Sequence, residues 1–385
     1  MKKKLLIPLL LSNLVYAQSF VPDAPELNLK SYILIEPNTN TVIAEFNSSS
    51  EIEPASMTKI MTSYVVADQI ANGLISLEDQ VLISEKAWRM GGSKMFIEAG
   101  KKVSISDLLK GVIIQSGNDA SVAISEYAGG TERGFVDLMN AYADSLGMNN
   151  TIFQNSTGLP DENHFSSAKD LATLTSNFII KFPDIYSLYK EKQFTFNNIK
   201  QLNRNKLLWR DESSDGVKTG HTEAAGYCLV GSAKRGDMRL ITVVAGSDTD
   251  NNRFLASQRL LEYGFRFFAT QKVLNANEEY KKIKIWGGVE QSLGIGVLED
   301  VSITLPRTSF KDLTVNYNYS NNIQAPIYAG QTIGTIEIVS NEEVVFSTEL
   351  VALKEIKSKG FFGRLWSKFV LWVYGLFGMT ENGNN

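Results

Sequence analysis

Apolar and polar residues follow two different patterns along this chain, and the change between them divides it. In the first part, strand-like runs at residues 31–35, 41–46, 226–233 and 238–246 lie at both ends of a long stretch with helical periodicity. Turn residues 37–40 join the first two runs, and a Lys-Arg-Gly-Asp turn joins the last two, so each pair predicts an antiparallel hairpin. Helices must cover such a sheet, which predicts an α+β domain over residues 25–270 with a helical insert.

Three helical regions are predicted in this domain. One helix runs over residues 56–71 and ends at Asn72-Gly73. Residues 104–147 are mostly helical, and residues 252–268 form a closing helix. Capping-box patterns begin at Ser104 and at Ser167.

From about residue 275 the runs become short and often alternate, and turns separate them. They lie at residues 283–285, 297, 301–305, 313–317, 333–339 and 344–351. This spacing is typical of a separate all-β domain, and we expect a small sandwich over residues 275–356.

The two ends of the chain differ from both domains. Residues 1–17 have three lysines, a short apolar stretch and Val15-Tyr16-Ala17, which is the pattern of a cleaved secretory signal peptide. Residues 357–385 have apolar residues on one helical face beside basic ones, and the uninterrupted apolar run is too short to span a bilayer. We therefore expect an exported, periplasmic protein, held peripherally on the outer face of the cytoplasmic membrane through residues 357–379. The alternative is a helix docked on the protein's own core.

Composition excludes several classes of site and partner. The formal net charge is −4 and cleavage of residues 1–17 would make it more negative, so nucleic-acid binding is not expected. Cys228 is the one cysteine, which rules out an intrachain disulfide, and we interpret it as a buried small apolar residue. Because the chain contains only this cysteine and two histidines, no metal site and no cofactor are expected.

The candidate chemistry begins with Ser-x-x-Lys. A serine hydroxyl is a weak nucleophile, and a lysine one helical turn away can act as its base if the lysine pKa is depressed. The pattern occurs at Ser56/Lys59, Ser166/Lys169 and Ser187/Lys190. The second of these fits helix capping and the third a surface run, whereas Ser56 stands at a helix start, where backbone N–H groups favour a developing anion.

Two more elements supply partners. Ser116-Gly117-Asn118 lies in a predicted loop between helices, where either polar residue alone is more simply interpreted as an N-cap. Lys218-Thr219-Gly220 precedes a strand, where the alternative is a turn with an exposed lysine; the glycine suits a strand edge that a substrate backbone approaches closely.

These three elements, in this order and spacing, are the set found in β-lactamases and penicillin-binding proteins. The chain resembles the serine-type D-Ala-D-Ala carboxypeptidases, the low-molecular-mass penicillin-binding proteins of the penicillin-binding protein 5/6 type. The resemblance extends to residues 54–59, 202–205, 215–222 and 263–268 and covers essentially the whole chain. It implies a β-lactamase/transpeptidase-like catalytic domain, with helices on both faces of its sheet, followed by the β domain and the amphipathic tail.

The resemblance also implies roles. Ser56 is the nucleophile, Lys59 its base, and Ser116 with Lys218 relays a proton to the leaving D-alanine. Asn118 holds the peptide side of the substrate. The resemblance places the terminal carboxylate of the substrate on the side chains of Lys218, Thr219 and Arg204. Arg253 is a weaker candidate for supporting that region. Backbone N–H groups of Ser56 and His221, beside Gly220, would form the oxyanion hole.

The implied substrate is the peptidoglycan stem pentapeptide, with β-lactam antibiotics as covalent inhibitors. A β-lactamase is the alternative at the same site, but residues 160–164 lack the spacing of the glutamate that activates the deacylating water in class A enzymes. A non-catalytic cell-wall-binding protein is a further alternative, although it would have no need of the two lysines. D,D-endopeptidase activity is compatible with the same residues.

Overall fold

A computed structural model describes residues 21–363, 365–366 and 369–370. Its first domain is built on a five-stranded antiparallel sheet in the order β2-β1-β9-β8-β7. The strands are β1 (Ser31–Glu36), β2 (Thr41–Phe46), β7 (Ser214–Thr222), β8 (Gly226–Arg235) and β9 (Met238–Ser247). Both expected hairpins are confirmed, because β1 pairs with β2 and β8 with β9. Strand β7 is therefore a sheet edge.

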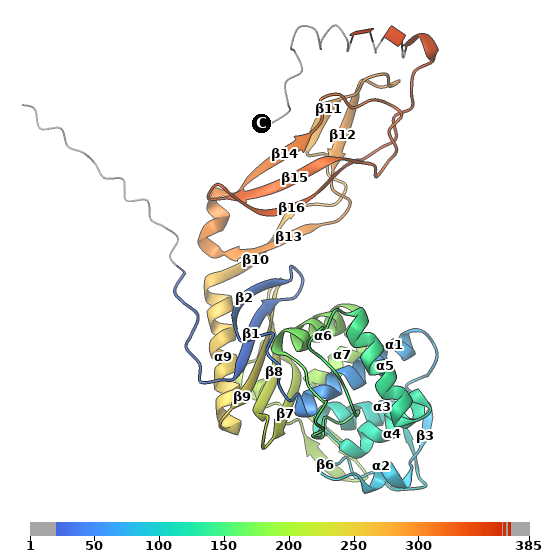
Figure 1. Ribbon diagram of the computed structural model, residues 1–385, viewed down its shortest axis with the longest axis vertical. Coiled ribbons are helices and arrows are strands. Elements are labelled where there is room, and N and C mark those ends of the chain that lie inside the picture. The colour runs from blue at the N-terminus through green and yellow to red at the C-terminus, as the bar shows by residue number, and fades with distance from the viewer. Residues whose placement is uncertain (1–20, 364, 367–368, 371–385) are drawn as a thin grey trace, which may run out of the picture.

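Helices cover both faces of this sheet (Figure 1), as expected for the α+β class. One face carries α9 (Asp250–Phe267). The other faces the insert, which contains η1 (Ala55–Thr58), α1 (Lys59–Ala71), α2 (Glu85–Arg89), α3 (Ile105–Lys110), η2 (Gly111–Gln115), α4 (Asn118–Gly129), α5 (Glu132–Ser145), α6 (Ala168–Lys181), α7 (Pro183–Tyr186), η3 (Ser187–Lys190) and α8 (Leu207–Arg210). Two short ladders complete it, β3 (Gln80–Leu82) with β4 (Lys102–Ser104) and β5 (Gln193–Phe196) with β6 (Ile199–Leu202).

Two apolar cores follow from the alternation of side chains along each strand. Ile33 and Val243 belong to the core under the insert, whereas their neighbours Leu34 and Val244 pack in the core beneath α9. Helix α1 is buried on nearly all sides, so it is the central helix of the insert. The chain thereby fixes the start of α1 at the centre of the domain, next to the edge strand β7.

The second domain is all β, as expected. Its strands are β10 (Phe268–Leu274), β11 (Lys281–Lys284), β12 (Ser292–Gly296), β13 (Val301–Pro306), β14 (Thr314–Tyr319), β15 (Thr332–Ser340) and β16 (Glu343–Ala352), with η4 (Arg307–Asp312) between β13 and β14. A five-stranded sheet in the order β11-β12-β16-β15-β14 and the β10-β13 ladder share one apolar core.

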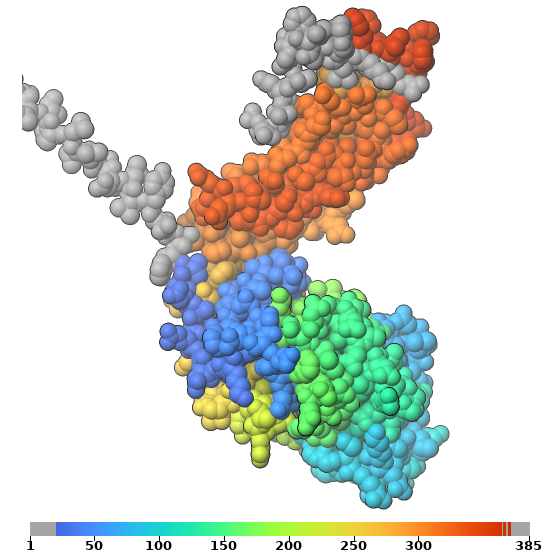
Figure 2. Space-filling view, viewed as in Figure 1, coloured from blue at the N-terminus to red at the C-terminus, as the bar shows by residue number. Residues whose placement is uncertain are grey.

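The two domains form separate lobes joined where α9 leads into β10 (Figure 2). Strand β10 lies between the predicted closing helix and the predicted start of the β domain, and it pairs with β13. Thr39 Oγ1 and Thr304 Oγ1 lie 2.7 Å apart across the junction, and Arg307 donates to the Phe265 carbonyl at 2.9 Å. These contacts join the β1–β2 turn and the end of α9 to the β domain.

The signal-peptide prediction, residues 1–17, lies outside the described residues, and so does most of the predicted tail helix. Of the predicted tail, residues 357–360 are described and not helical, whereas residues 361–363, 365–366 and 369–370 are helical. Its large apolar side chains are more than half exposed: Phe361, Phe362, Leu365, Trp366 and Phe369. In the described part of the chain, no helix combines the length and apolar character needed to cross a bilayer.

Candidate active site

Ser56 lies in a tight turn at the start of the central helix. The turn is the 3₁₀ segment η1, which leads directly into α1, and Ala55 just before the serine has a left-handed φ of 45°. A Cβ on Gly220 of β7 would lie 3.0 Å from the Pro54 carbonyl oxygen. The close approach at Gly220 is therefore made by the protein's own Ser56 turn, and not by a substrate backbone as predicted from the sequence.

Lys59 is fully buried directly beneath this turn. Its Nζ donates to Ser56 Oγ at 3.1 Å, to Asn118 Oδ1 at 2.7 Å and to the Thr157 carbonyl at 2.5 Å. Burial lowers the pKa of Lys59 to about 7; the nearby Arg204 also lowers it, whereas Asp119 acts in the opposite direction. A neutral amine beside the hydroxyl is thus accessible near neutral pH.

Ser116 occupies a strained position between two helices. It is the C-terminal cap of η2, with a left-handed φ of 65°, and Gly117 is the N-cap of α4. The N-cap interpretation of Ser116 or Asn118 is therefore wrong, because the cap is Gly117, the residue between them. In this strained conformation the Ser116 hydroxyl accepts a hydrogen bond from Lys218 Nζ of β7 at 2.9 Å.

Lys218 is buried in the middle of β7, so the alternative of an exposed lysine in a turn is also wrong. Its second hydrogen bond goes to the Thr219 carbonyl at 3.0 Å. Burial lowers the pKa of Lys218 well below its usual range, and the charges of Lys59, Arg204 and Arg253 add to this effect. The site therefore contains two serine hydroxyls, each hydrogen-bonded to a lysine whose ammonium form is disfavoured.

The outer residues of the site come from β7, α9 and the loop after β6. Thr219 is buried, and the exposed His221 stacks its ring on Tyr227 at a centroid distance of 4.1 Å. The exposed Arg204 donates from Nε to the Gln115 carbonyl at 3.0 Å, next to Ser116. Thr219 and His221 thus lie on β7, which packs against the Ser56 turn, and Arg204 lies next to Ser116.

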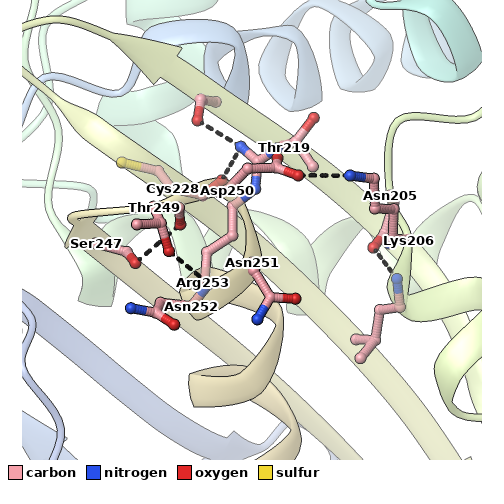
Figure 3. A network of polar contacts seen from close by, with 12 residues as sticks. Asn205, Lys206, Thr219, Cys228, Ser247, Thr249, Asp250, Asn251, Asn252 and Arg253 are labelled. Atoms are coloured by element: carbon pink, nitrogen blue, oxygen red, sulfur yellow. Dashed lines mark hydrogen bonds and ion pairs between the residues drawn. The ribbon is translucent and has the colours of Figure 1, made fainter.

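Arg253 extends from α9 toward strands β7 and β8 (Figure 3). It is buried on α9 and donates to the carbonyls of Gly220 and Cys228 at 3.0 and 3.3 Å, which links β7 to β8. The second terminal nitrogen of its guanidinium, Nη2, pairs with Asp250, which also binds Lys206 at 2.6 Å. Arg253 therefore fixes β7 at Gly220 from the face of the sheet that α9 covers.

The other two Ser-x-x-Lys pairs lie elsewhere in the fold. Ser167 is the N-cap of α6 and accepts a hydrogen bond from the Asp170 amide, as the capping box predicts; Ser166 itself is buried with its Oγ 2.9 Å from Thr151 Oγ1, and Lys169 is exposed. Ser187 and Lys190 are both exposed in η3.

Sequence reasoning missed two buried residues of the site. Asp119 accepts from the backbone amides of residues 95–97 at 2.8 to 3.3 Å, and His164 Nε2 lies 2.9 Å from Thr58 Oγ1. Asp119 directly follows the Ser-x-Asn element, which was a usable signal; nothing local marks His164. Across the described residues, no group of three His, Cys, Asp or Glu side chains is placed to hold a metal ion.

Comparison with known proteins agrees with this geometry. Residues 18–249 match the D-alanyl-D-alanine carboxypeptidase family, peptidase S11, and residues 268–358 match the C-terminal domain of penicillin-binding protein 5. The chain is 41% identical to the D-alanyl-D-alanine carboxypeptidase DacC of Escherichia coli, over 94% of this chain and 93% of that protein.

Solved structures give the same answer. Penicillin-binding protein 5 of Haemophilus influenzae superimposes with a TM-score of 0.84 at 39% identity, covering 88% of this chain and all of that one. Penicillin-binding protein D2 of Listeria monocytogenes, solved in a cefotaxime-bound form, superimposes with a TM-score of 0.59 at 27% identity, covering 63% of this chain and all of that one. This chain belongs to the D-alanyl-D-alanine carboxypeptidase family, peptidase S11.

Proposed function

We propose that this protein is a serine-type D-alanyl-D-alanine carboxypeptidase that removes the terminal D-alanine from peptidoglycan stem pentapeptides. The observation that carries the proposal is the pair of hydrogen bonds Lys59–Ser56 and Lys218–Ser116, with Asn118 bound to Lys59. Two serine–lysine pairs at one site supply both a base for attack and an acid for departure, which acyl transfer to a serine requires.

Acylation begins at Ser56. Neutral Lys59 takes the hydroxyl proton as Ser56 Oγ attacks the carbonyl carbon between the two D-alanines. Backbone N–H groups of Ser56 and His221 stabilise the oxyanion that forms, and Asn118 orients the peptide on its acyl side. The left-handed Ala55 turn supports this step, because it holds the hydroxyl at the helix start.

Departure of D-alanine follows when the carbonyl re-forms and the C–N bond breaks. The leaving nitrogen takes a proton from Ser116, and Ser116 takes one in turn from the ammonium form of Lys218 along the 2.9 Å hydrogen bond; the lowered pKa of Lys218 makes this ammonium a stronger acid than an exposed one. The terminal carboxylate lies against Lys218, Thr219 and Arg204, where the guanidinium gives a charge-assisted bond. Water then hydrolyses the Ser56 ester and regenerates the enzyme.

β-Lactams are proposed to acylate the same serine, because their amide carbonyl mimics the scissile bond. The Listeria relative solved with cefotaxime supports this proposal. A β-lactamase is less well supported: Glu162 is exposed, and within residues 21–363 no carboxylate forms a hydrogen bond or ion pair with Ser56 or Lys59. A non-catalytic wall-binding protein would leave the burial of Lys59 and Lys218 without a purpose.

The remaining chain is proposed to place this site at the membrane. We assign residues 25–270 to the catalytic domain, 275–356 to the β domain and 357–385 to a peripheral anchor on the periplasmic face; β10 begins at the end of the first range and pairs with β13 of the β domain. The exposed apolar side chains of the described tail residues support the anchor. Deletion of residues 357–385 is expected to move the protein from the membrane to the soluble fraction; unchanged partitioning would refute the anchor.

The test of the activity uses penicillin and a stem pentapeptide. Intact-protein mass spectrometry is expected to show one penicillin adduct, located on Ser56 and absent from Ser56→Ala. The same preparation is expected to release D-alanine from the pentapeptide. No adduct together with no D-alanine overturns the proposal, whereas fast cephalosporin hydrolysis without D-alanine release favours the β-lactamase.

A further inference from the structure

Residues 155–159 form a tight loop that packs against the Ser56 turn. Gly158 in this loop has a left-handed φ of 82°, and a Cβ on it would lie 1.8 Å from the Ala55 carbonyl oxygen. Two side-chain hydroxyls, one on α1 and one on α4, donate to the Ser156 carbonyl at 2.7 and 2.8 Å. The loop is therefore in contact with the Ser56 turn and with the two helices that carry Lys59 and Asn118.

The loop supplies the carbonyl oxygen of Thr157 to the active site. This oxygen accepts a hydrogen bond from Lys59 Nζ at 2.5 Å, and Lys59 also binds Asn118 Oδ1 and Ser56 Oγ. A neutral lysine amine has two hydrogens and one lone pair. When Thr157 and Asn118 accept the two hydrogens, the lone pair is left for the hydroxyl of Ser56. The group that places the Thr157 carbonyl therefore also orients the base.

The side chain of Asn155 holds the loop in this conformation. Its Oδ1 accepts from the backbone amides of Thr157, Gly158 and Leu159 at 3.1, 2.8 and 3.2 Å. The hydroxyl of Thr157 donates to the same oxygen at 2.8 Å, and Asn155 Nδ2 donates to the Leu159 carbonyl at 3.0 Å. One amide thus closes the loop through local side-chain-to-backbone bonds, as asparagine does in Asx turns.

His164 links Asn155 to the Ser56 turn by a second route. Asn155 Nδ2 lies 3.3 Å from His164 Nδ1, and His164 Nε2 lies 2.9 Å from Thr58 Oγ1. Because an amide nitrogen only donates, Nδ1 is the acceptor of the imidazole ring, and Nε2 is then the donor to Thr58. Asn155 is therefore connected to Lys59 through the loop and to the neighbouring Thr58 through His164.

We infer that Asn155 is a positioning residue for the general base, because it folds residues 155–159 so that the Thr157 carbonyl faces Lys59. The inference rests on the proposed function and adds to it a residue that acts through a backbone carbonyl. Removal of the Asn155 amide has two expected consequences. The ammonium form of Lys59 loses one of its three acceptors, and the neutral amine loses a contact that turns its lone pair toward Ser56.

Charged or titratable groups from several elements interact with Lys59: Asp119 of α4, Arg204 after β6, Lys218 of β7 and His164. Burial lowers the pKa of Lys59 most strongly, Asp119 opposes this effect and Arg204 adds to it. Residues 155–159 contain no titratable side chain. Asn155→Ala keeps all of these groups, so a changed titration of Lys59 in that variant reports the loss of the Thr157 contact.

The experiment follows penicillin acylation of the full chain by mass spectrometry between about pH 5 and about pH 10. Asn155→Ala is expected to lower the acylation rate on the alkaline plateau about 10- to 100-fold, because the base is no longer aligned with the hydroxyl. The midpoint of the acid limb is expected to move about one unit to lower pH, because the ammonium has lost a charge-assisted hydrogen bond. A loss of folded protein alone would lower the plateau and leave the midpoint unchanged.

Asn140→Ala is the matched control. Asn140 on α5 binds the backbone of Phe153 in the same manner, donating to its carbonyl at 2.9 Å and accepting from its amide at 2.8 Å. It therefore fastens the chain two residues before the loop, and its removal is expected to leave the plateau and the midpoint at their wild-type values. Asn155→Ser retains a hydroxyl that can accept from the loop amides, so a smaller shift in the same direction is expected.

The outcomes separate the two proposals. A wild-type chain that forms no penicillin adduct overturns the proposed function, and the role of Asn155 with it. A wild-type chain that is acylated while the midpoint of Asn155→Ala stays unchanged, or moves equally in Asn140→Ala, overturns the role of Asn155 alone. If circular dichroism shows that Asn155→Ala does not fold, Asn155→Ser decides by the same criterion.

Discussion

Lys59 Nζ donates to Ser56 Oγ at 3.1 Å, and this contact uses only one of the three donors of an ammonium. The other two bind Asn118 Oδ1 and the Thr157 carbonyl, so a charged Lys59 has all three donors satisfied. Both of these acceptors lack a hydrogen, whereas Ser56 Oγ can also donate. When Lys59 loses a proton, its lone pair therefore faces Ser56, which is the arrangement a general base requires.

The first prediction is the pH dependence of acylation. Lys59 must be neutral to accept the Ser56 proton, and its pKa is about 7, so kcat/KM is expected to fall as the pH drops below about 7 and to level off above it. Rates of penicillin acylation and of D-alanine release measured across this range check it. An acid limb with its midpoint near 4 would instead assign the titration to a carboxylate.

Lys59→Arg serves as the control for this prediction. Arginine keeps the charge but cannot deprotonate, so acylation is expected to fall by about 10²- to 10⁴-fold at every pH. An arginine variant that retained the wild-type pH profile would show that Lys59 is not the base.

The second prediction concerns Arg204. Its charge lowers the pKa values of both Lys59 and Lys218. Arg204→Gln is therefore expected to shift the acid limb of kcat/KM to higher pH, and to raise KM about 10- to 100-fold through loss of the carboxylate contact. Arg204→Lys separates the two effects, because it keeps the charge and loses the guanidinium fork. In that variant only KM is expected to change.

The motifs around Ser56 could be predicted from sequence because each is a local pattern of chemistry. Their convergence could not be predicted from local pattern, since Lys218 lies 102 positions from its partner Ser116. Only the resemblance to a known family predicted that the three motifs form one site, because hydrophobic periodicity does not indicate which distant segments meet. The same limit explains why the alternative of an exposed turn lysine at position 218 was wrong. The residues next to Lys218 in sequence would be the same in a turn and in a buried strand, so only tertiary contacts distinguish the two.

Other features had no sequence signal at all. Strand β10 was missed because only Ala269 and Leu274 in it are buried, so its apolar alternation is weak. Phe96 and Leu202 line one cleft although more than 100 residues separate them in sequence, and the amide of Phe96, whose φ is left-handed, donates to Asp119. Tertiary contacts set all three, and they override local propensity.

The third prediction tests Asp250, which pairs with both Arg253 and Lys206. Arg253 holds the Gly220 carbonyl, and Lys206 follows the loop that carries Arg204, so Asp250 ties the two sides of the proposed carboxylate site together. Asp250→Asn is expected to raise KM for the pentapeptide severalfold and to leave kcat little changed, because Asp250 positions these groups without touching the reacting atoms. Steady-state kinetics, which give KM and kcat separately, check this prediction.

The control is Asp248→Asn, because the Asp248 carboxylate binds only Asn252 within the described residues. Equal effects from both variants would contradict the assignment of Asp250.

The fourth prediction links His164 to stability. His164 is buried behind the Ser56 turn, and burial lowers its pKa from 6.5 to about 4. Its Nδ1 accepts from the Gln154 amide at 3.4 Å, so a second proton there would oppose an existing donor. The unfolded chain binds that proton below pH 6.5 and the native protein does not, so the free energy of unfolding falls as the pH falls from 6.5 toward 4. The expected loss is about 2 kcal/mol at about pH 5, measured by urea unfolding followed by circular dichroism.

Glutamine has a similar shape and no titration in this range, so His164→Gln is expected to lose that part of the pH dependence even if its stability at neutral pH is lower. Wild-type and variant curves that fall in parallel between about pH 6.5 and 4 would assign the acid sensitivity to other groups.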